Sequence, residues 1–172
     1  SSSIFTKVYF PRILIPFSAV ISGLVDFLIA LAVIGVLMAY YSIIPTWNIL
    51  WLPILIIIMV LFSSGIGFIL SALAIQYRDV RHAIQFMSQL LMYAAPVVWP
   101  VTLITEKFGD NAKLIYGSYP MVGVIEGFRS AFLGHEKMPF DIIAIGFVVS
   151  IIFFAIGFYY FNKKEQIFVD VA

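Results

Sequence analysis

Tyr77-Arg78-Asp79-Val80-Arg81-His82 is a short charged stretch between two long apolar runs, and it decides how the chain is organised. No charged residue occurs from Trp51 to Ile75, and none occurs from Ala83 to Ile104. Each run is close in length to the roughly 20 helical residues that cross the hydrocarbon core of a bilayer. The charged stretch is therefore predicted to be a loop at one membrane face. Its two arginines favour the cytoplasmic face.

The composition excludes an ordinary soluble domain. Of the 172 residues, 63% are hydrophobic and 11% are charged. A typical soluble domain is about 45–50% apolar and about 25% charged. The net charge of +1 is spread between apolar blocks, so the chain lacks the basic stripe that binds a phosphate backbone, and we expect no nucleic-acid partner.

Four stretches are long and apolar enough to span a bilayer as helices, at residues 17–41, 51–75, 83–104 and 142–161. Helices are expected because an open strand edge in lipid leaves backbone groups unpaired. With four spans, the Tyr77–His82 loop and both ends of the chain share one face. That face carries six Lys or Arg residues and the opposite face carries four, so the bias predicts that both ends are cytoplasmic.

Residues 105–134 form an unusual segment, because it is too long for a turn and too apolar for a solvated loop. The part from Val122 to Gly134 is helix-like, begins just after Pro120, and ends at a glycine suited to a C-cap. It is too short to cross a bilayer, as is the apolar piece before it. We expect two short re-entrant helices between the last two spans. The predicted fold class is an all-α integral membrane protein, with a single transmembrane domain over residues 1–172.

Two features inside the spans stand out by polarity or size. Asp26 is the one ionisable residue deep inside a span, where a charge costs at least about 2.5–3.5 kcal/mol. It either lines or gates a polar pathway, or it is a structural aspartate hydrogen-bonded to Ser22. The stretch Ser63-Ser64-Gly65-Ile66-Gly67 lacks the lysine of a phosphate-binding loop. We interpret it as a small-residue patch for close helix packing.

Further candidates lie near the predicted outer face. Glu126 and Arg129 are three residues apart, which permits an ion pair on one helix face. The pair either stabilises its helix or acts at a pore mouth. Tyr93 and Trp99 lie near the outer end of the third span, among prolines that would bend or end a helix. They belong either to an interfacial aromatic belt or to a surface that stacks on sugar rings.

The sequence gives no positive support for an enzyme. No cysteine is present, and no cluster of His and carboxylate residues has the spacing of a metal site. No nucleophile and base stand out as a pair, so no catalytic residue and no metal ligand are predicted. No GxxxxGK[ST] loop occurs, so any ATP that the protein uses must bind to another chain.

Five segments together resemble the ABC-2 family of exporter permeases, and most closely its polysaccharide branch, which exports O-antigen, capsule or teichoic acid chains. In chain order they are Lys7-Val8-Tyr9-Phe10-Pro11-Arg12, Ser22-Gly23-Leu24-Val25-Asp26-Phe27, Tyr77-Arg78-Asp79-Val80-Arg81, Pro120 with Ile125-Glu126-Gly127-Phe128-Arg129, and the tail from Tyr160 to Asp170. The resemblance runs from end to end of the chain. One departure is Tyr119-Pro120, where the family usually has Asn-Pro.

The resemblance implies a permease of six spans that works as a homodimer with two separate ATPase subunits. The chain would be the C-terminal part of such a permease, without an N-terminal amphipathic helix and two spans. It would bind no cofactor itself and would not be an enzyme, because ATP and Mg would be held by the partner ATPase. The cargo would be a lipid-linked polysaccharide crossing the bacterial inner membrane. The alternatives are an ABC-2 permease for a drug or lipid, and a non-transporting multi-pass assembly subunit or membrane enzyme.

The resemblance also sorts the candidate residues into three groups. The substrate pathway would be lined by Asp26, Tyr93, Trp99, Tyr116 and Tyr119. The outer gate would include Glu126 and Arg129. The cytoplasmic face that couples to the ATPase would include Lys7, Tyr9, Arg12, Arg78 and Arg81. The last two arginines either bind lipid headgroups or lie near the ATPase, and the first three residues either anchor the chain at the membrane or dock on the partner.

Overall fold

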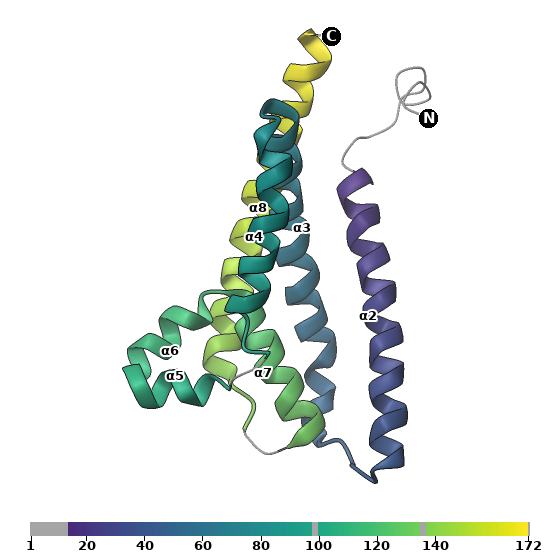
Figure 1. Cartoon of the computed structure of the whole chain (residues 1–172), viewed down its shortest axis with the longest axis vertical. Helices are drawn as coiled ribbons and strands as arrows, with labels where there is room; N and C mark the ends of the chain where they lie inside the picture. Colours follow the sequence, from purple (N-terminus) through teal and green to yellow (C-terminus); the bar gives the residue numbers. More distant parts are fainter. Residues whose placement is uncertain (1–13, 98–99, 135–136, 172) are drawn as a thin grey trace.

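The computed structural model describes residues 14–97, 100–134 and 137–171, and within these it contains helices and no strands. The elements in chain order are α2 (Leu14–Tyr40), the 3-10 helix η1 (Trp47–Trp51), α3 (Leu52–Gln76), α4 (Asp79–Ala94), α5 (Val101–Phe108), α6 (Asp110–Gly117), α7 (Pro120–Leu133) and α8 (Phe140–Val171). Figure 1 shows α3 and α8 running side by side, with α7 against their lower halves. Three stretches are long and apolar enough to cross a membrane, at Pro16–Tyr40, Trp47–Gln76 and Phe140–Glu165.

Helices α3 and α8 make the most extensive contact in the structure, and glycines allow their close approach. A Cβ atom added to Gly65 would lie 2.6 Å from the backbone carbonyl carbon of Phe153. A Cβ atom added to Gly157 would in turn meet the backbone of Gly65. The packing patch predicted in α3 is therefore confirmed at Gly65 and at the buried Ser64. It does not extend to Gly67, where an added Cβ atom would meet nothing within 4 Å.

Helix α7 is the short apolar helix predicted after Pro120, and it fills the lower end of the bundle. Pro120 is its first residue, and Gly134 ends it in the left-handed conformation at φ 69°. Its inner face packs on α3 and α8 through a buried cluster that includes Leu55 and Val124. The hydroxyl of Thr46 donates to the Ala131 carbonyl at 3.1 Å, so the connection before η1 caps the last turn of α7.

Helix α2 touches the rest of the bundle lightly. It packs mainly on α3, and ring contacts join Phe17 to Phe68 at 5.0 Å and Phe27 to Phe128 at 5.4 Å. None of the membrane-length window of this helix is buried inside the protein. An apolar helix with so little protein contact is suited to lipid or to another protein surface as its surroundings.

The third predicted span, at residues 83–104, is not one continuous helix, and it is interrupted where its prolines were predicted to bend or end the helix. Helix α4 ends at Ala94, the backbone turns at the buried Pro96, and α5 starts only at Val101. Proline lacks the N–H that a helix interior needs, which explains the break. The 16 residues of α4 extend about 24 Å, which is short of the roughly 30 Å of hydrocarbon in a bilayer.

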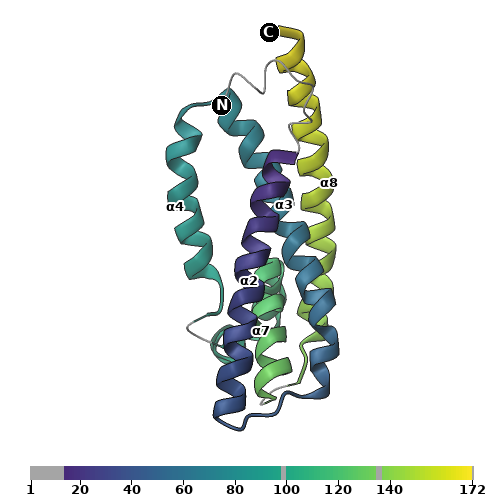
Figure 2. The same ribbon diagram turned by 90° about the vertical axis from the view of Figure 1, so that its right-hand side faces the viewer.

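The segment after this break contains three short helices where two were predicted. Helices α5 and α6 project to one side of the bundle in Figure 1, and α7 lies within it. Figure 1 also places the start of α2, the end of α8 and the α3–α4 turn at one end of the molecule. The connection from α2 to η1 and the end of α7 lie at the other end (Figures 1 and 2). The start of α2, the end of α8 and the Tyr77–His82 turn therefore share one end of the molecule, in agreement with the predicted topology.

Candidate functional site

Two tyrosines of the α6–α7 segment hold the end of α4. The hydroxyl of Tyr116 donates to the carbonyl of Ala94, and that of Tyr119 donates to the carbonyl of Leu91 at 3.0 Å. Carbonyls in the last turn of a helix, such as that of Ala94, lack the partners that the helix interior supplies. The Leu91 carbonyl also accepts the N–H of Ala95 at 3.2 Å. The two phenols therefore stabilise the point at which α4 stops, far from Tyr116 and Tyr119 in sequence. Neither role was predicted, because only their aromatic character was considered.

Glu126 and Arg129 hold the backbone just beyond this point. The carboxylate of Glu126 accepts a hydrogen bond from Arg129 at 2.8 Å and another from the backbone N–H of Val101, the first residue of α5, at 3.1 Å. Arg129 also donates to the carbonyl of Val97 at 2.6 Å. Only 6% of Glu126 is exposed. The predicted ion pair is present, and it joins α7 to the break between α4 and α5 as well as stabilising its own helix.

We call these four side chains the break clamp: Tyr116, Tyr119, Glu126 and Arg129. Each reaches from α6 or α7, or from the turn between them, to backbone groups of residues 91–101. The clamp therefore fixes where the interrupted helix bends. Helix α4 also contacts α3, and a short turn joins the two helices.

A large apolar cavity lies between α4 and the bundle. Its volume is about 850 Å³, and α3, α4, α6, α7 and α8 contribute to its walls. Tyr116 and Tyr119 line it, and the ring of Tyr119 meets that of Phe62 edge-to-face at 5.8 Å. Burial, with a smaller contribution from Tyr116, raises the pKa of the Tyr119 phenol. The phenol therefore stays protonated and keeps donating its hydrogen bond at neutral pH.

Asp26 lies in a different place, in a groove between α2 and α3. The groove has a volume of about 700 Å³, and Ser63, Gly67 and Ser71 line its α3 wall at intervals of one helical turn. Asp26 is exposed in the groove. Among the hydrogen bonds of the described residues none joins it to Ser22, so the structure gives no support to the proposed bond between them.

The other predicted residues are scattered. Tyr93 is 66% exposed on the outside of α4, and Arg78 and Arg81 are exposed beside the α3–α4 turn. Trp99, Lys7, Tyr9 and Arg12 lie outside the described residues. Of the predicted pathway residues, the structure therefore brings together Tyr116 and Tyr119, and it places Asp26 and Tyr93 elsewhere.

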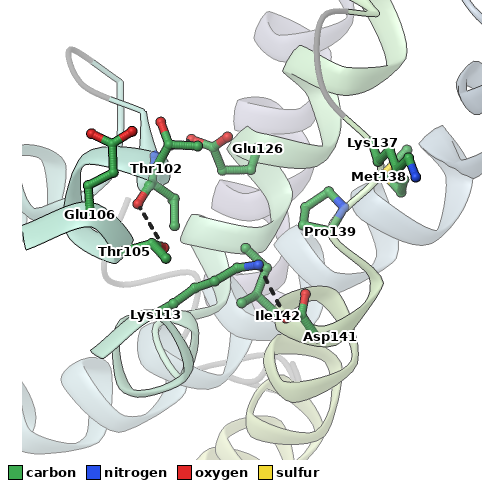
Figure 3. A pocket seen from close by; sticks show the side chains of 11 residues that line it. Thr102, Thr105, Glu106, Lys113, Glu126, Lys137, Met138, Pro139, Asp141 and Ile142 are labelled. Carbon is green, nitrogen blue, oxygen red and sulfur yellow. Dashed lines mark hydrogen bonds and ion pairs between the residues drawn. The ribbon is translucent and has the colours of Figure 1, made fainter. Parts of the chain in front are cut away.

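Sequence reasoning missed a polar pocket at the end of the molecule opposite the α3–α4 turn. Helices α5, α6, α7 and the start of α8 enclose about 470 Å³, and Figure 3 shows Lys113 reaching from α6 to Asp141 on α8. The two charged groups are 3.3 Å apart. Glu106, Thr102 and Thr105 supply the α5 wall. In the sequence, Glu106, Lys113 and Asp141 served only to predict which face of the membrane the segment lies on. The one signal that could have indicated a pocket is the presence of several charged residues within an otherwise apolar region.

The residues that the structure describes hold no group of three or more His, Asp or Glu positioned for a metal ion. The polar groups that gather most closely are those of the break clamp and of the polar pocket. The apolar cavity and the α2–α3 groove are lined mainly by apolar side chains and contain few polar groups.

The fold and these sites define a helical, multi-pass membrane protein. No model of a known protein family matches the chain. The chain is 26% identical over 162 residues to the O-antigen export system permease protein RfbA of Myxococcus xanthus, covering 94% of this chain and 62% of that protein. It is 28% identical over 172 residues to the protein of the same name from Klebsiella pneumoniae, covering 99% of this chain and 64% of that one. The resemblance to the polysaccharide branch of export permeases is thereby confirmed, and the chain spans less than two thirds of the length of these relatives.

Proposed function

We propose that the chain is part of the transmembrane permease subunit of an ATP-driven exporter, which moves a lipid-linked polysaccharide across the bacterial inner membrane. The observation that carries the proposal is the similarity to O-antigen export permeases over nearly the whole chain. The apolar helices support it, because they are long enough to cross a membrane. The break between α4 and α5 is compatible with it, because non-helical backbone in a membrane is tolerated where protein covers it. As the C-terminal part of a six-span permease, the chain works beside a second copy of itself.

The apolar cavity is the proposed site of cargo passage within this chain. It is bounded on one side by α4, which side-chain hydrogen bonds hold at its far end. The rings of Tyr116 and Tyr119 present faces on which sugars can stack, and the surrounding aliphatic wall suits the lipid carrier. Asp26 and Tyr93 do not line this cavity: Asp26 lines the α2–α3 groove, and Tyr93 is exposed on α4.

The break clamp is the proposed outer gate. Movement of α4 relative to α7 must lengthen or break the hydrogen bonds that Glu126 and Arg129 make to residues 97 and 101. The opposite end of the molecule would then face the cytoplasm, with both chain ends and Arg78 and Arg81 on that side. Lys7, Tyr9 and Arg12 would meet the ATPase there, and ATP and Mg would be held by that partner.

A second candidate is a permease for a lipid or an apolar drug. The observation that favours it is the wall of the apolar cavity, which contains few polar groups. Its aliphatic residues include Ile66, Leu70 and Val149. Both candidates share the membrane architecture, so cargo specificity has to be measured.

The two candidates are separated by ATP turnover of the full-length permease reconstituted with its ATPase. A lipid-linked glycan is expected to stimulate turnover, and the same carrier lipid without the glycan is expected to have little effect. A matched pair of variants adds a structural readout: Tyr119→Leu, which removes a ring from the cavity wall, should reduce the stimulation, whereas Tyr93→Leu, at an exposed position of α4, should not. Equal stimulation by the glycan-free lipid would favour the second candidate and refute glycan export.

A further inference from the structure

We propose that the polar pocket between α5, α6 and α8 is a binding site for a sugar unit of a neutral glycan. The proposal rests on the proposed export of a glycan for its biological meaning, but its evidence is the chemistry of the pocket. The pocket volume of about 470 Å³ falls within the roughly 300–1,000 Å³ of small-molecule sites. The pocket is therefore large enough for a single sugar or a short oligosaccharide.

The pocket has a polar wall and an apolar floor. Thr102, Thr105 and Glu106 lie along α5, Lys113 reaches from α6 toward Asp141, and Lys137 lies just before α8 (Figure 3). The floor includes Ile142, which is fully buried, and Met138, which is 5% exposed. Sugars have hydroxyl edges and C–H faces, so a site of this composition can hydrogen-bond the edges and pack against a face.

The charges of the pocket oppose an ionic ligand. Lys113 is paired with Asp141 at 3.3 Å, and Glu126 is paired with Arg129 at 2.8 Å. Glu106 and Lys137 add one further carboxylate and one further ammonium group to the walls. The charges of the lining are therefore nearly balanced, and neither an anion nor a cation meets a wall of uniform opposite charge. A neutral polyol is favoured, because each hydroxyl can donate to a carboxylate and accept from an ammonium group.

The pair of Lys113 and Asp141 is accessible enough to serve a ligand. The two side chains are 30% and 49% exposed, so their mutual attraction is weakened by solvent. Hydrogen bonds to charged groups are stronger than those between neutral groups. A sugar hydroxyl that bridges the ammonium and the carboxylate would therefore gain two such bonds without removing either charge from its partner.

The pocket is also joined to the break clamp. Glu126 lines the pocket and at the same time accepts the N–H of Val101 at the start of α5. A ligand that binds beside α5 would therefore be separated from the break between α4 and α5 only by the side chain of Glu126. In an exporter, this location would let a sugar that occupies the pocket stabilise one position of α5.

The test is a ligand titration of the full-length permease in lipid nanodiscs, read by saturation-transfer NMR. The probes are N-acetylglucosamine, mannose and rhamnose as neutral sugars, with inorganic phosphate as the anion. At least one sugar is expected to bind and phosphate is not expected to displace it. Asp141→Asn is expected to weaken sugar binding about tenfold or more, as the loss of a charge-assisted hydrogen bond implies. Asp110→Asn, at the exposed start of α6, is the matched control and should leave binding unchanged.

Three results would overturn the proposal: no binding of any sugar, tighter binding of phosphate, or equal binding by Asp141→Asn and the control. A double variant, Lys113→Gln with Asp141→Asn, removes both charges together and leaves no unpaired charge, so it checks that a loss is not due to misfolding. It is expected to melt within a few degrees of the wild type and to bind sugar at least about tenfold more weakly. Unchanged binding in the double variant would refute a direct role. Glycan-stimulated ATP turnover without sugar binding would refute this site while leaving the exporter proposal intact.

Discussion

Replacing Gly65 with alanine is expected to push α3 and α8 apart. The new Cβ atom would lie 2.6 Å from the carbonyl carbon of Phe153, whereas non-bonded carbon atoms prefer about 3.5–4.0 Å. The clash is with backbone, so no rotamer change can relieve it. The two helices would have to separate locally by roughly 1 Å, and such overpacking typically costs about 1–3 kcal/mol.

Gly67→Ala is the matched control, because it makes the same chemical change two residues along the same helix. An added Cβ atom at Gly67 meets nothing within 4 Å. Both variants gain the same intrinsic helix propensity, about 1 kcal/mol at most, so the difference between them reports the packing cost alone. Gly65→Ala should therefore be less stable than Gly67→Ala by about 1–3 kcal/mol.

The measurement is reversible unfolding of the full-length permease in bicelles, with the two variants compared under identical conditions. Gly157→Ala gives a second check, since its Cβ atom would meet the backbone of Gly65 from the other helix. It should be destabilised like Gly65→Ala. Equal stability of Gly65→Ala and Gly67→Ala would show that α3 and α8 do not approach closely at this point, and the reasoning would fail.

Three further predictions concern the clamp and the topology. Glu126→Ala removes the partner of Arg129 and of a backbone N–H, and should lower the free energy of unfolding by about 1–3 kcal/mol; no change in a denaturation curve would mean that the clamp does not hold. Tyr119→Phe loses one hydrogen bond and should cost about 1 kcal/mol, while the exposed Tyr93→Phe should cost nothing measurable in the same assay, and equal melting temperatures would contradict this. Because the chain has no cysteine, single cysteines at Arg81 and Leu133 should react with a membrane-impermeant maleimide from opposite sides of the membrane; labelling of both from one side would contradict the topology.

The membrane architecture was largely predictable from the sequence because the thickness of the bilayer sets the length of each apolar helix that spans it. A run of about 20 apolar residues is recognisable without knowledge of its neighbours. The second and fourth predicted stretches lie within long helices, and the first ends one residue beyond one. The prolines near Pro96 were recognised as helix breakers. The helix before them ends at Ala94, which agrees with that prediction.

The sites were less predictable because their partners are distant in sequence. Glu126 accepts the N–H of a residue 25 positions away, and Tyr119 donates to a carbonyl 28 positions away. Neither backbone group carries any signal in the sequence. The polar pocket likewise depends on Lys113 and Asp141 meeting across two helices, whereas the spacing of Glu126 and Arg129 on one helix allowed their pairing to be predicted.

Translocation itself is the measurement that tests the proposed function most directly. The full-length permease and its ATPase are placed in proteoliposomes that hold a lipid-linked glycan on the side where ATP is added, and a glycosidase confined to the opposite side reports arrival. The glycan is expected to become sensitive to the enzyme only when ATP is hydrolysed. Steady ATP hydrolysis with the glycan fully protected, in vesicles shown to be intact, would contradict it.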